Sequence, residues 1–155
     1  MIYTPPCNIT ERDFTKKTVF LAGSIELGKA IDWQTQMGKF FEKLDYNVFN
    51  PRRPDWDNTW VQDYANPSFV QQVKWELNAL RVADIILMFY DPSTMSPISM
   101  LELGLFASSG KMHVICPEGF WRKGNVDIVC DEWRIPMYKD LDEFETYMIR
   151  QHGKA

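Results

Sequence analysis

The sequence predicts an α/β fold, and three observations support this prediction. Short apolar runs alternate along the chain with segments of helical periodicity, an order that produces a parallel sheet with helices on both faces. Residues 85–89 are apolar without interruption, as in a strand that is buried on both sides. The 155 residues are the size of one domain. We therefore expect a single flavodoxin-like or Rossmann-like domain.

Composition narrows the classes of partner and cofactor. The apolar and charged fractions, 45% and 25%, are typical of a soluble globular protein, and the formal net charge of −4 argues against nucleic-acid binding. The three cysteines have no CxxC spacing and there are two histidines, so we expect no disulfide framework, no metal and no cofactor. No apolar run is long enough to span a membrane, and no signal peptide is evident. A reducing, cytoplasmic location is expected.

The first part of the chain combines a strand with a glycine-containing turn. Residues 1–15 have turn chemistry and are expected to form an N-terminal arm, followed by one domain over 16–155. A strand is predicted at 18–22, and the turn after it contains Gly23, Ser24 and Lys29. Glycines before a helix allow an anion to approach the backbone closely. Gly23, Ser24 and Lys29 are therefore candidate phosphate ligands, and a simple turn is the alternative.

A second candidate segment follows the next strand. Apolar spacing predicts a helix at 32–44, and a short strand follows at 48–49. The loop after that strand is rich in groups that recognise ligands: Arg52, Arg53, Asp55 and Trp56. Arginines can hold a phosphate or pair with the aspartates, and a tryptophan can stack on a base. The alternative is a surface loop whose charges pair with each other.

Two glutamates lie near apolar helix faces in the middle of the chain. A helix predicted at 69–82, with Ser68 as a possible cap, places Glu76 close to its apolar stripe. The strand at 85–89 leads through a loop at 90–99 into a helix that ends at Gly110, and Glu102 is near the start of that helix. Each glutamate has an ordinary alternative role: Glu76 on the helix surface, and Glu102 as a residue that favours the helix dipole.

The remaining segments complete the predicted sheet. We expect a strand at 112–116, a loop at the sheet edge over 117–127, a short strand at 135–138 and a closing helix at 140–151. The carboxyl ends of parallel strands bind ligands in open α/β folds, so the loops after these strands are the places to seek a site.

The chain resembles the nucleoside 2-deoxyribosyltransferase family, in its deoxyribosyltransferase-like branch. The resemblance is based on the segments LAGSIELG, NPRRPDWD, WELNAL and MLELGLFASSGK, and it spans roughly residues 18–130. It implies that Glu102 is the nucleophile, that Glu76 orients the sugar hydroxyl, and that the turn at Ser24 touches a phosphate. It also implies that the loop containing Asn125 completes a neighbouring subunit's site in a homodimer or higher homo-oligomer.

The expected reaction is cleavage or transfer at an N-glycosidic bond of a nucleoside or its monophosphate. A carboxylate attacks the anomeric carbon and forms a glycosyl ester, while the leaving base takes up a proton. Asp91 or Asp55 is a candidate donor of that proton, because Ser96 occupies the position where the family has an aspartate. Water as acceptor makes the enzyme a hydrolase and a second base makes it a transferase. A non-catalytic nucleotide sensor and an ordinary partner-binding domain are the other two hypotheses.

Overall fold

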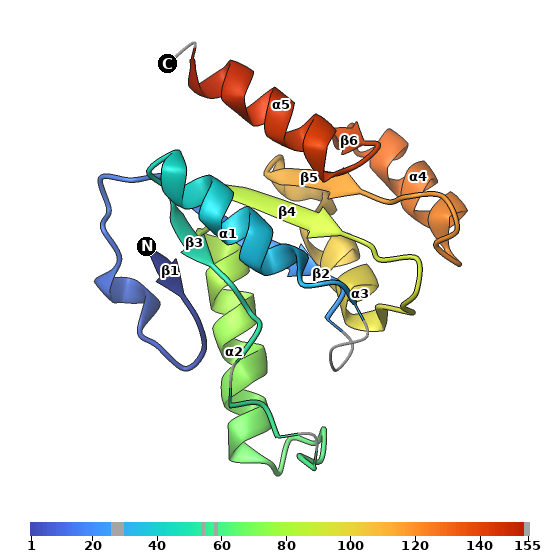
Figure 1. The fold of residues 1–155 in the computed structure, drawn as a ribbon. Helices are drawn as coiled ribbons and strands as arrows, with labels where there is room; N and C mark the ends of the chain where they lie inside the picture. The colour runs from blue at the N-terminus through green and yellow to red at the C-terminus, as the bar shows by residue number, and fades with distance from the viewer. Residues whose placement is uncertain (26–29, 54, 58, 154–155) are drawn as a thin grey trace. The chain divides into compact units, whose positions relative to one another are not determined.

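The structure is a computed structural model, and it describes residues 1–25, 30–53, 55–57 and 59–153. Its strands form a six-stranded sheet in the order β1-β3-β2-β4-β5-β6, and the strand pairings recorded for it are parallel (Figure 1). This confirms the predicted α/β class. The chain divides into two compact units, unit 1 with residues 1–21 and 34–84, and unit 2 with residues 22–33 and 85–155. Each unit is described by itself.

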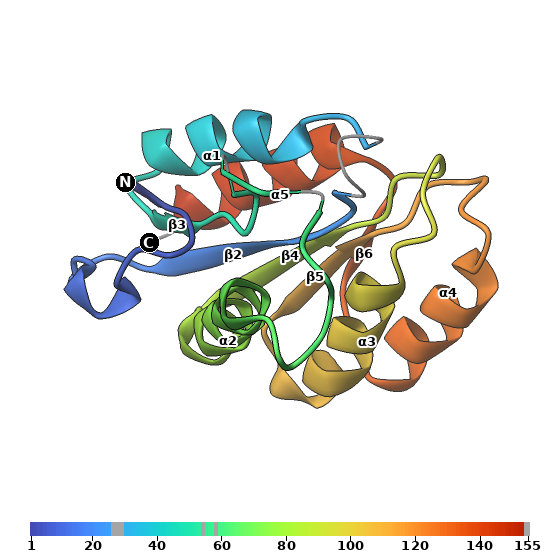
Figure 2. The ribbon, with the colours of Figure 1, turned by 90° about the horizontal axis from the view of Figure 1, so that it is seen from below.

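Unit 1 contains two strands, most of a third, and two helices. The strands are β1 (Ile2–Tyr3), β3 (Asn47–Phe49) and the first four residues of β2 (Thr18–Gly23), and the helices are α1 (Trp33–Lys43) and α2 (Pro67–Val82). The register places Ile2 beside Val48 and Val19 beside Val48 on its other side. The two helices lie on opposite faces of these strands (Figure 2). Every residue of β3 is buried, as expected for a central parallel strand.

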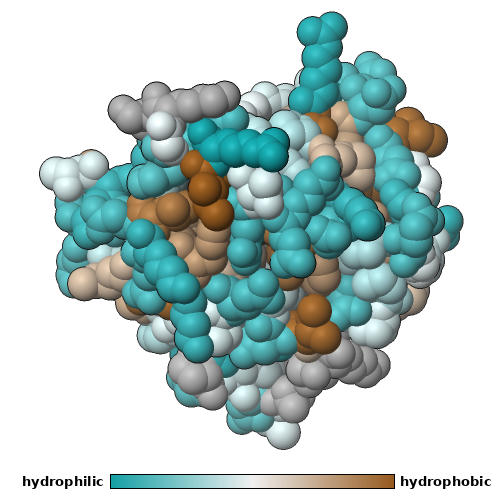
Figure 3. Space-filling view, turned by 45° about the horizontal axis from the view of Figure 1, so that its top comes forward, coloured by the Kyte–Doolittle hydropathy of each residue, from teal (hydrophilic) through white to brown (hydrophobic). Residues whose placement is uncertain are grey.

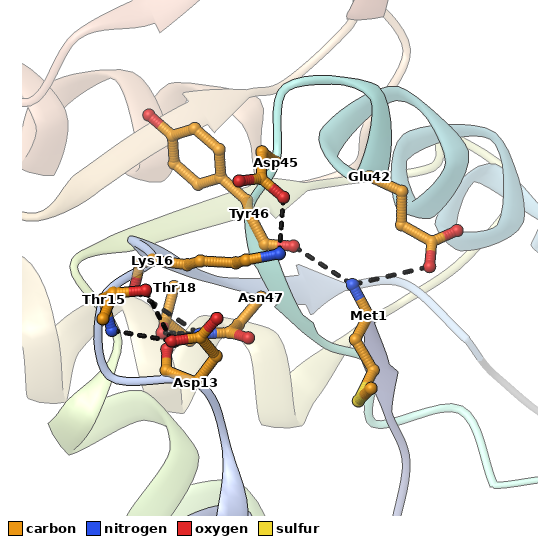
Figure 4. Close-up of polar contacts among 9 residues, drawn as sticks. All are labelled: Met1, Asp13, Thr15, Lys16, Thr18, Glu42, Asp45, Tyr46 and Asn47. Atoms are coloured by element: carbon orange, nitrogen blue, oxygen red, sulfur yellow. Dashed lines mark hydrogen bonds and ion pairs between the residues drawn. The ribbon is translucent and has the colours of Figure 1, made fainter.

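The N-terminal residues, expected to be an arm, contain β1 and a short 3-10 helix (Ile9–Glu11). The Met1 amine donates to the Tyr46 carbonyl and forms an ion pair with Glu42, and the Asn47 amide donates to the Asp13 carbonyl (Figure 4). A strand of two residues has too little alternation to be recognised in the sequence. These contacts attach the segment to β3 and to the end of α1.

Helix α2 begins two residues earlier than the sequence predicted, and its cap is Asn66 instead of Ser68. The Asn66 side chain accepts hydrogen bonds from the backbone N–H groups of Ser68 and Phe69, at 3.1 and 3.3 Å. Pro67 then occupies the first helical position, where its missing N–H leaves no hydrogen bond unmade. Asparagine is at least as good a cap as serine, so the sequence already contained both the cap, Asn66, and the proline that follows it.

Unit 2 contains three parallel strands and three helices. The strands are β4 (Ile85–Phe89), β5 (Met112–Ile115) and β6 (Met137–Tyr138). The helices are α3 (Pro97–Phe106), α4 (Lys123–Glu132) and α5 (Leu141–His152). Helices α3 and α4 lie on one face of these strands, and α5 lies on the other (Figure 2). A 3-10 turn, η3 (Ala107–Ser109), follows α3 and ends at Gly110 with a left-handed backbone, as predicted.

The starts of α3 and α4 differ from those predicted, and β6 begins at Met137 instead of residue 135. Helix α3 begins at Pro97 instead of residue 100, because a proline is accepted in the first turn. Residues 123–127, expected in a loop, form the start of α4. Val126 and Cys130 are both 1% exposed and four residues apart, which is helical spacing. Gly124, within the first turn of α4, is a poor helix former, and for that reason the sequence did not predict a helix there.

Three further observations concern the surface and the cysteines. The face shown in Figure 3 is mostly hydrophilic, with small and separate hydrophobic areas. Within the described ranges, no helix is long and apolar enough to cross a membrane. All three cysteines are free; Cys116 and Cys130 are buried, and Cys7 is partly exposed.

Candidate functional site

The residues predicted to form the site are distributed over both units. Unit 1 contains Arg52, Arg53, Asp55, Trp56 and Glu76, and unit 2 contains Gly23, Ser24, Asp91, Glu102 and Asn125. Lys29 lies outside the described residues. The two groups are considered in turn, beginning with unit 2.

Glu102 is a buried carboxyl group in an apolar helix. It lies in the middle of α3 and is 8% exposed, with Leu103 beside it and Ser99 one turn earlier also buried. Its electrostatic neighbour is Tyr90, the residue that directly follows β4. A carboxyl group can persist in such a place only with polar or charged neighbours, and Glu102 has partners of this kind. This is the environment in which a glutamate becomes a nucleophile or an acid.

Tyr90 links the end of β4 to the helix that carries Glu102. Its ring is fully buried against Phe120, with 4.8 Å between ring centroids, and its hydroxyl donates to the Ser99 carbonyl at 3.1 Å. Burial raises the pKa of Tyr90, and the nearby Cys116, Cys130 and Glu102 raise it further. The phenol therefore stays neutral, and its hydroxyl remains a donor to the Ser99 carbonyl oxygen. This hydrogen bond fixes the first turn of α3 relative to the strand.

Ser24 belongs to a cluster of three buried hydroxyl groups, together with Thr94 and Ser96. The Ser24 hydroxyl lies 2.9 Å from that of Thr94 and 2.6 Å from that of Ser96, and Thr94 and Ser96 are 2.7 Å apart. The Asp91 backbone N–H also donates to the Ser24 oxygen at 2.8 Å. Ser24 is 1% exposed, so its side chain is used to join the turn after β2 to the loop after β4. The hydroxyl predicted to touch a phosphate is engaged inside the protein.

Gly23 is required by a close backbone approach. Its φ is +130°, and a Cβ atom there would lie 2.1 Å from the Phe89 carbonyl oxygen. The Ser24 N–H donates to this same oxygen at 2.9 Å. Any other residue at position 23 would therefore both strain the backbone and collide with β4. The glycine that the sequence singled out for contact with a ligand has a structural reason of its own.

Asp91 accepts hydrogen bonds from several backbone and side-chain donors. One oxygen accepts from the N–H and hydroxyl of Ser93, at 2.9 and 2.7 Å, and the other accepts from the Ile31 N–H at 3.0 Å. Burial acts to raise the pKa of this carboxyl group, but the hydrogen bonds from Ser93 and Ile31 outweigh it, and the pKa is lowered. Asp91 is thus an ionised carboxylate that orders its loop, which is poorly suited to donating a proton.

Asn125 lies in the first turn of α4 and not in a sheet-edge loop as predicted. The residue is exposed, and it lines a small pocket of about 90 Å³ formed with Met100, Leu103 and Gly104 of α3 and Val126 and Val129 of α4. The pocket is therefore apolar apart from the Asn125 amide.

In unit 1, Glu76 is paired with a glutamine one helical turn away. Gln72 is 4% exposed, and its Nε2 donates to Glu76 Oε1 at 2.8 Å and to the Pro51 carbonyl at 3.0 Å. Burial raises the pKa of Glu76 to about 7, against an ordinary value of 4.5, although the hydrogen bond from Gln72 lowers it. A carboxyl group with such a pKa changes its protonation near neutral pH, as a general acid or base must.

The loop after β3 is organised around Arg53. The Arg53 guanidinium binds both oxygens of Asp55, at 2.7 and 3.1 Å, and lies over the Trp60 ring at 4.9 Å. Hydrogen bonds from Arg53 hold the pKa of Asp55 below its usual range. Trp56 packs edge-on against Trp60, and its buried Nε1 has no hydrogen-bond partner. The pairing of Arg53 with Asp55 therefore agrees with the alternative prediction, a surface loop whose charges pair with each other.

Three contributors to these arrangements were missed from the sequence: Gln72, Tyr90 and Thr94. Gln72 precedes Glu76 by four residues, a spacing that places two helical side chains together, so its signal was available. Tyr90 and Thr94 belong to a loop whose hydrogen bonds depend on the strand before it, and no local pattern reports such contacts.

No group of three or more histidine, cysteine or acidic side chains in the described part of the chain is placed to hold a metal ion. The candidate residues described above contribute carboxyl groups, hydroxyl groups and an arginine paired with Asp55.

Comparisons with known proteins agree with this architecture. Residues 16–120 match the family described as "Nucleoside 2-deoxyribosyltransferase like". The chain is also similar in fold to a conserved protein from Enterococcus faecalis V583, with a TM-score of 0.61 and 10% sequence identity over 90% of this chain and 98% of the other. The comparison with curated proteins found no match. Because the family match covers more than half of the chain and includes Glu76 and Glu102, the protein belongs to the nucleoside 2-deoxyribosyltransferase-like family.

Proposed function

We propose that the protein cleaves or transfers the N-glycosidic bond of a nucleoside, deoxynucleoside or corresponding 5′-monophosphate, with Glu102 as the nucleophile. The observation that carries this proposal is the burial of Glu102. Burying an acidic side chain that is 8% exposed in an apolar helix costs stability, and a function for Glu102 would explain why that cost is accepted. The family membership of residues 16–120 gives that function its chemical class.

The proposed reaction has two steps. A Glu102 carboxylate oxygen forms a bond to the anomeric carbon while the bond from that carbon to the base nitrogen breaks, and the departing nitrogen takes the electron pair and a proton from solvent water. The resulting glycosyl ester is then attacked at the same carbon by water or by a second base. The incoming nucleophile loses a proton, and Glu102 leaves as the carboxylate. Water gives free sugar, and a base gives a new nucleoside.

Among the proposed acidic residues, Glu76 is suited to carrying a proton. The pKa values of Asp91 and Asp55 are lowered by their hydrogen bonds, so both are ionised at neutral pH. Burial raises the pKa of Glu76 to about 7. We keep Glu76 as the residue that contacts the sugar hydroxyl, and its pKa allows it to exchange a proton there. We propose Arg52 as a phosphate ligand, because it lies in the loop that directly follows β3, where open α/β folds bind ligands.

The test is an assay of base release with a matched variant. The purified protein is incubated with each nucleoside, each deoxynucleoside and each 5′-monophosphate, with and without free adenine, and the bases are separated by chromatography. Glu102→Gln keeps the side-chain volume but removes the nucleophile, so turnover should fall roughly 1,000-fold or more. Product from the wild type and equal product from the variant would contradict the role of Glu102.

A non-catalytic nucleotide sensor is the second candidate, and it is supported by the saturated contacts of Ser24 and Asp91. The Ser24 hydroxyl and the Asp91 carboxylate form hydrogen bonds within the protein, so they can order a binding site without taking part in a reaction. For a sensor, a nucleotide would raise the melting temperature of both the wild type and Glu102→Gln, since bound ligands stabilise the folded state, and neither protein would form product.

A further inference from the structure

Gln72 is a buried polar residue on a helix face that otherwise packs against apolar groups. It is 4% exposed, and the other fully buried residues of α2 are Trp75, Ala79 and Leu80. A glutamine in such a position loses its contacts with water and must replace them with hydrogen bonds inside the protein. Its partners therefore indicate why it is there.

The amide of Gln72 is oriented by two acceptors. Nε2 donates to the Pro51 carbonyl oxygen at 3.0 Å and to Glu76 Oε1 at 2.8 Å, so both of its N–H groups are used. The amide oxygen, Oε1, is buried and has no hydrogen-bond partner. Turning the amide over would place that oxygen against two other oxygens, one of them on a carboxyl group. The observed orientation is the one that the carboxylate of Glu76 requires.

This arrangement costs stability. A buried acceptor without a partner is unfavourable, because it has lost its hydrogen bonds to water without replacing them. A methionine or leucine at position 72 would avoid this cost but would take the amide donor away from the Pro51 carbonyl and the Glu76 carboxyl group. We therefore attribute the presence of the amide to its nitrogen. The nitrogen joins a side chain of α2 to the backbone at the start of the loop that carries Arg52 and Arg53.

We propose that Gln72 is a positioning residue: its amide nitrogen, anchored to the Pro51 carbonyl, donates to Glu76 Oε1 and orients the Glu76 carboxylate. The proposal rests on the proposed function for its catalytic meaning, since it assumes that Glu76 contacts the sugar. Its structural content concerns unit 1 alone. Gln72 keeps Glu76 available as a hydrogen-bond acceptor at neutral pH, where burial by itself would leave the carboxyl group protonated.

The experiment measures the ionisation of Glu76 without substrate. Glutamate carboxyl carbons are labelled with ¹³C, the Glu76 signal is assigned from its loss in Glu76→Gln, and its chemical shift is followed from pH 4 to pH 9. A hydrogen bond to a charged group is worth about 1.5–3 kcal/mol, so Gln72→Met should raise the pKa of Glu76 by about one pH unit or more. Gln151→Met, at an exposed position near the end of α5, is the control and should leave it unchanged.

A second measurement uses the wild type, so the test does not depend on the folding of the variant. The ¹⁵N and ¹H signals of the Gln72 amide should shift with the same midpoint as the Glu76 carboxyl carbon, and that titration should be absent in Glu76→Gln. An unchanged or lowered pKa of Glu76 in Gln72→Met, or a Gln72 amide that does not respond to the titration, overturns the proposal.

Turnover gives the catalytic readout. If the proposed function holds, the pH dependence of kcat/KM should move in Gln72→Met by the same amount and in the same direction as the Glu76 pKa, which a purely structural defect would not produce. A kcat/KM profile that stays in place while the Glu76 pKa rises contradicts the catalytic role of the pair. Absence of any turnover in the wild type contradicts the proposed function and leaves the ¹³C result to decide the proposal for Gln72.

Discussion

At Glu76, one carboxyl group is subject to two opposing influences. Burial raises its pKa to about 7, and the hydrogen bond from Gln72 acts in the other direction. Between pH 4.5 and pH 7, the folded protein therefore holds a proton that the unfolded chain has already released. The folded state loses stability over this interval as the pH rises, because the buried group becomes charged.

Replacing Glu76 by glutamine should remove this loss. The variant should gain stability relative to the wild type as the pH rises from 4.5 to 7, by about 3 kcal/mol at the upper end, since each pKa unit corresponds to about 1.4 kcal/mol. Urea unfolding at pH 4.5, 6 and 8 measures the difference. A difference between the two proteins that is the same at all three pH values would show that Glu76 titrates normally.

Individual residues also show what the sequence could reveal about the site. Glu76 and Glu102 stood out because an acidic residue interrupts an apolar helical pattern, and that signal is local. The engagement of the Ser24 hydroxyl by Thr94 and Ser96 was not predictable, because these residues are about 70 positions apart and meet only when β2 and the loop after β4 are placed. The lowered pKa of Asp91 has the same origin, since Ile31 supplies one of its donors.

Among the elements, strands were predicted more closely than helix starts. The uninterrupted apolar run at 85–89 matches β4, because a strand buried on both faces needs no alternation. Helix α4 was assigned to a loop up to residue 127, since Gly124 and the neighbouring Gly119 and Pro117 have the composition of a turn. Burial of Val126 and Cys130 outweighs that composition, and burial depends on the rest of the fold.

Helix α3 leaves several large apolar side chains exposed. Ile98, Leu101 and Leu105 are 59%, 59% and 56% exposed, and their spacing places them on one face of the helix. A helix that is apolar on all sides is usually buried on all sides. We propose that this face of α3 packs against a second copy of the chain, as the family resemblance implies for a homo-oligomer.

The double variant Leu101→Lys, Leu105→Lys tests this packing. The wild type should elute as a dimer or larger species in size-exclusion chromatography with light scattering, and the variant should elute as a monomer. Ile149→Lys, at a position on α5 that is 57% exposed, is the control and should not change the assembly. A wild type that is monomeric at all concentrations tested would rule out this use of α3.

In the molecule as a whole, two partly buried titratable groups have opposite effects on stability as the pH changes. Burial lowers the pKa of His113 to about 4, from an ordinary value of 6.5. The unfolded chain therefore binds a proton at this residue before the folded protein does, and stability falls as the pH drops from 6.5 to 4. Glu76 has the opposite sign over the interval from pH 4.5 to 7. The two contributions largely cancel between pH 4.5 and pH 6.5.

Removing His113 should reveal this compensation. His113 is surrounded by Tyr138, Phe144 and Tyr147, so His113→Phe retains an aromatic ring among aromatic neighbours. The variant loses the hydrogen bond to Tyr138, which shifts its stability at every pH. Relative to the wild type, it should nevertheless gain about 3 kcal/mol on going from pH 7.5 to pH 4. Denaturant unfolding across this range gives the slope, and parallel curves would contradict the prediction.

The three cysteines differ in accessibility, which allows one of them to be labelled selectively. Burial raises the pKa of Cys116 and of Cys130 to about 12, so neither forms the thiolate that reacts with electrophiles at neutral pH. Burial raises the pKa of Cys7 as well, but this residue is partly exposed, and its carbonyl accepts a hydrogen bond from Trp75 of α2. A maleimide fluorophore should therefore attach to the native protein at one defined position, beside a natural tryptophan donor. The unmodified sequence thus provides an optical reporter on unit 1 with which ligand binding and local opening can be followed.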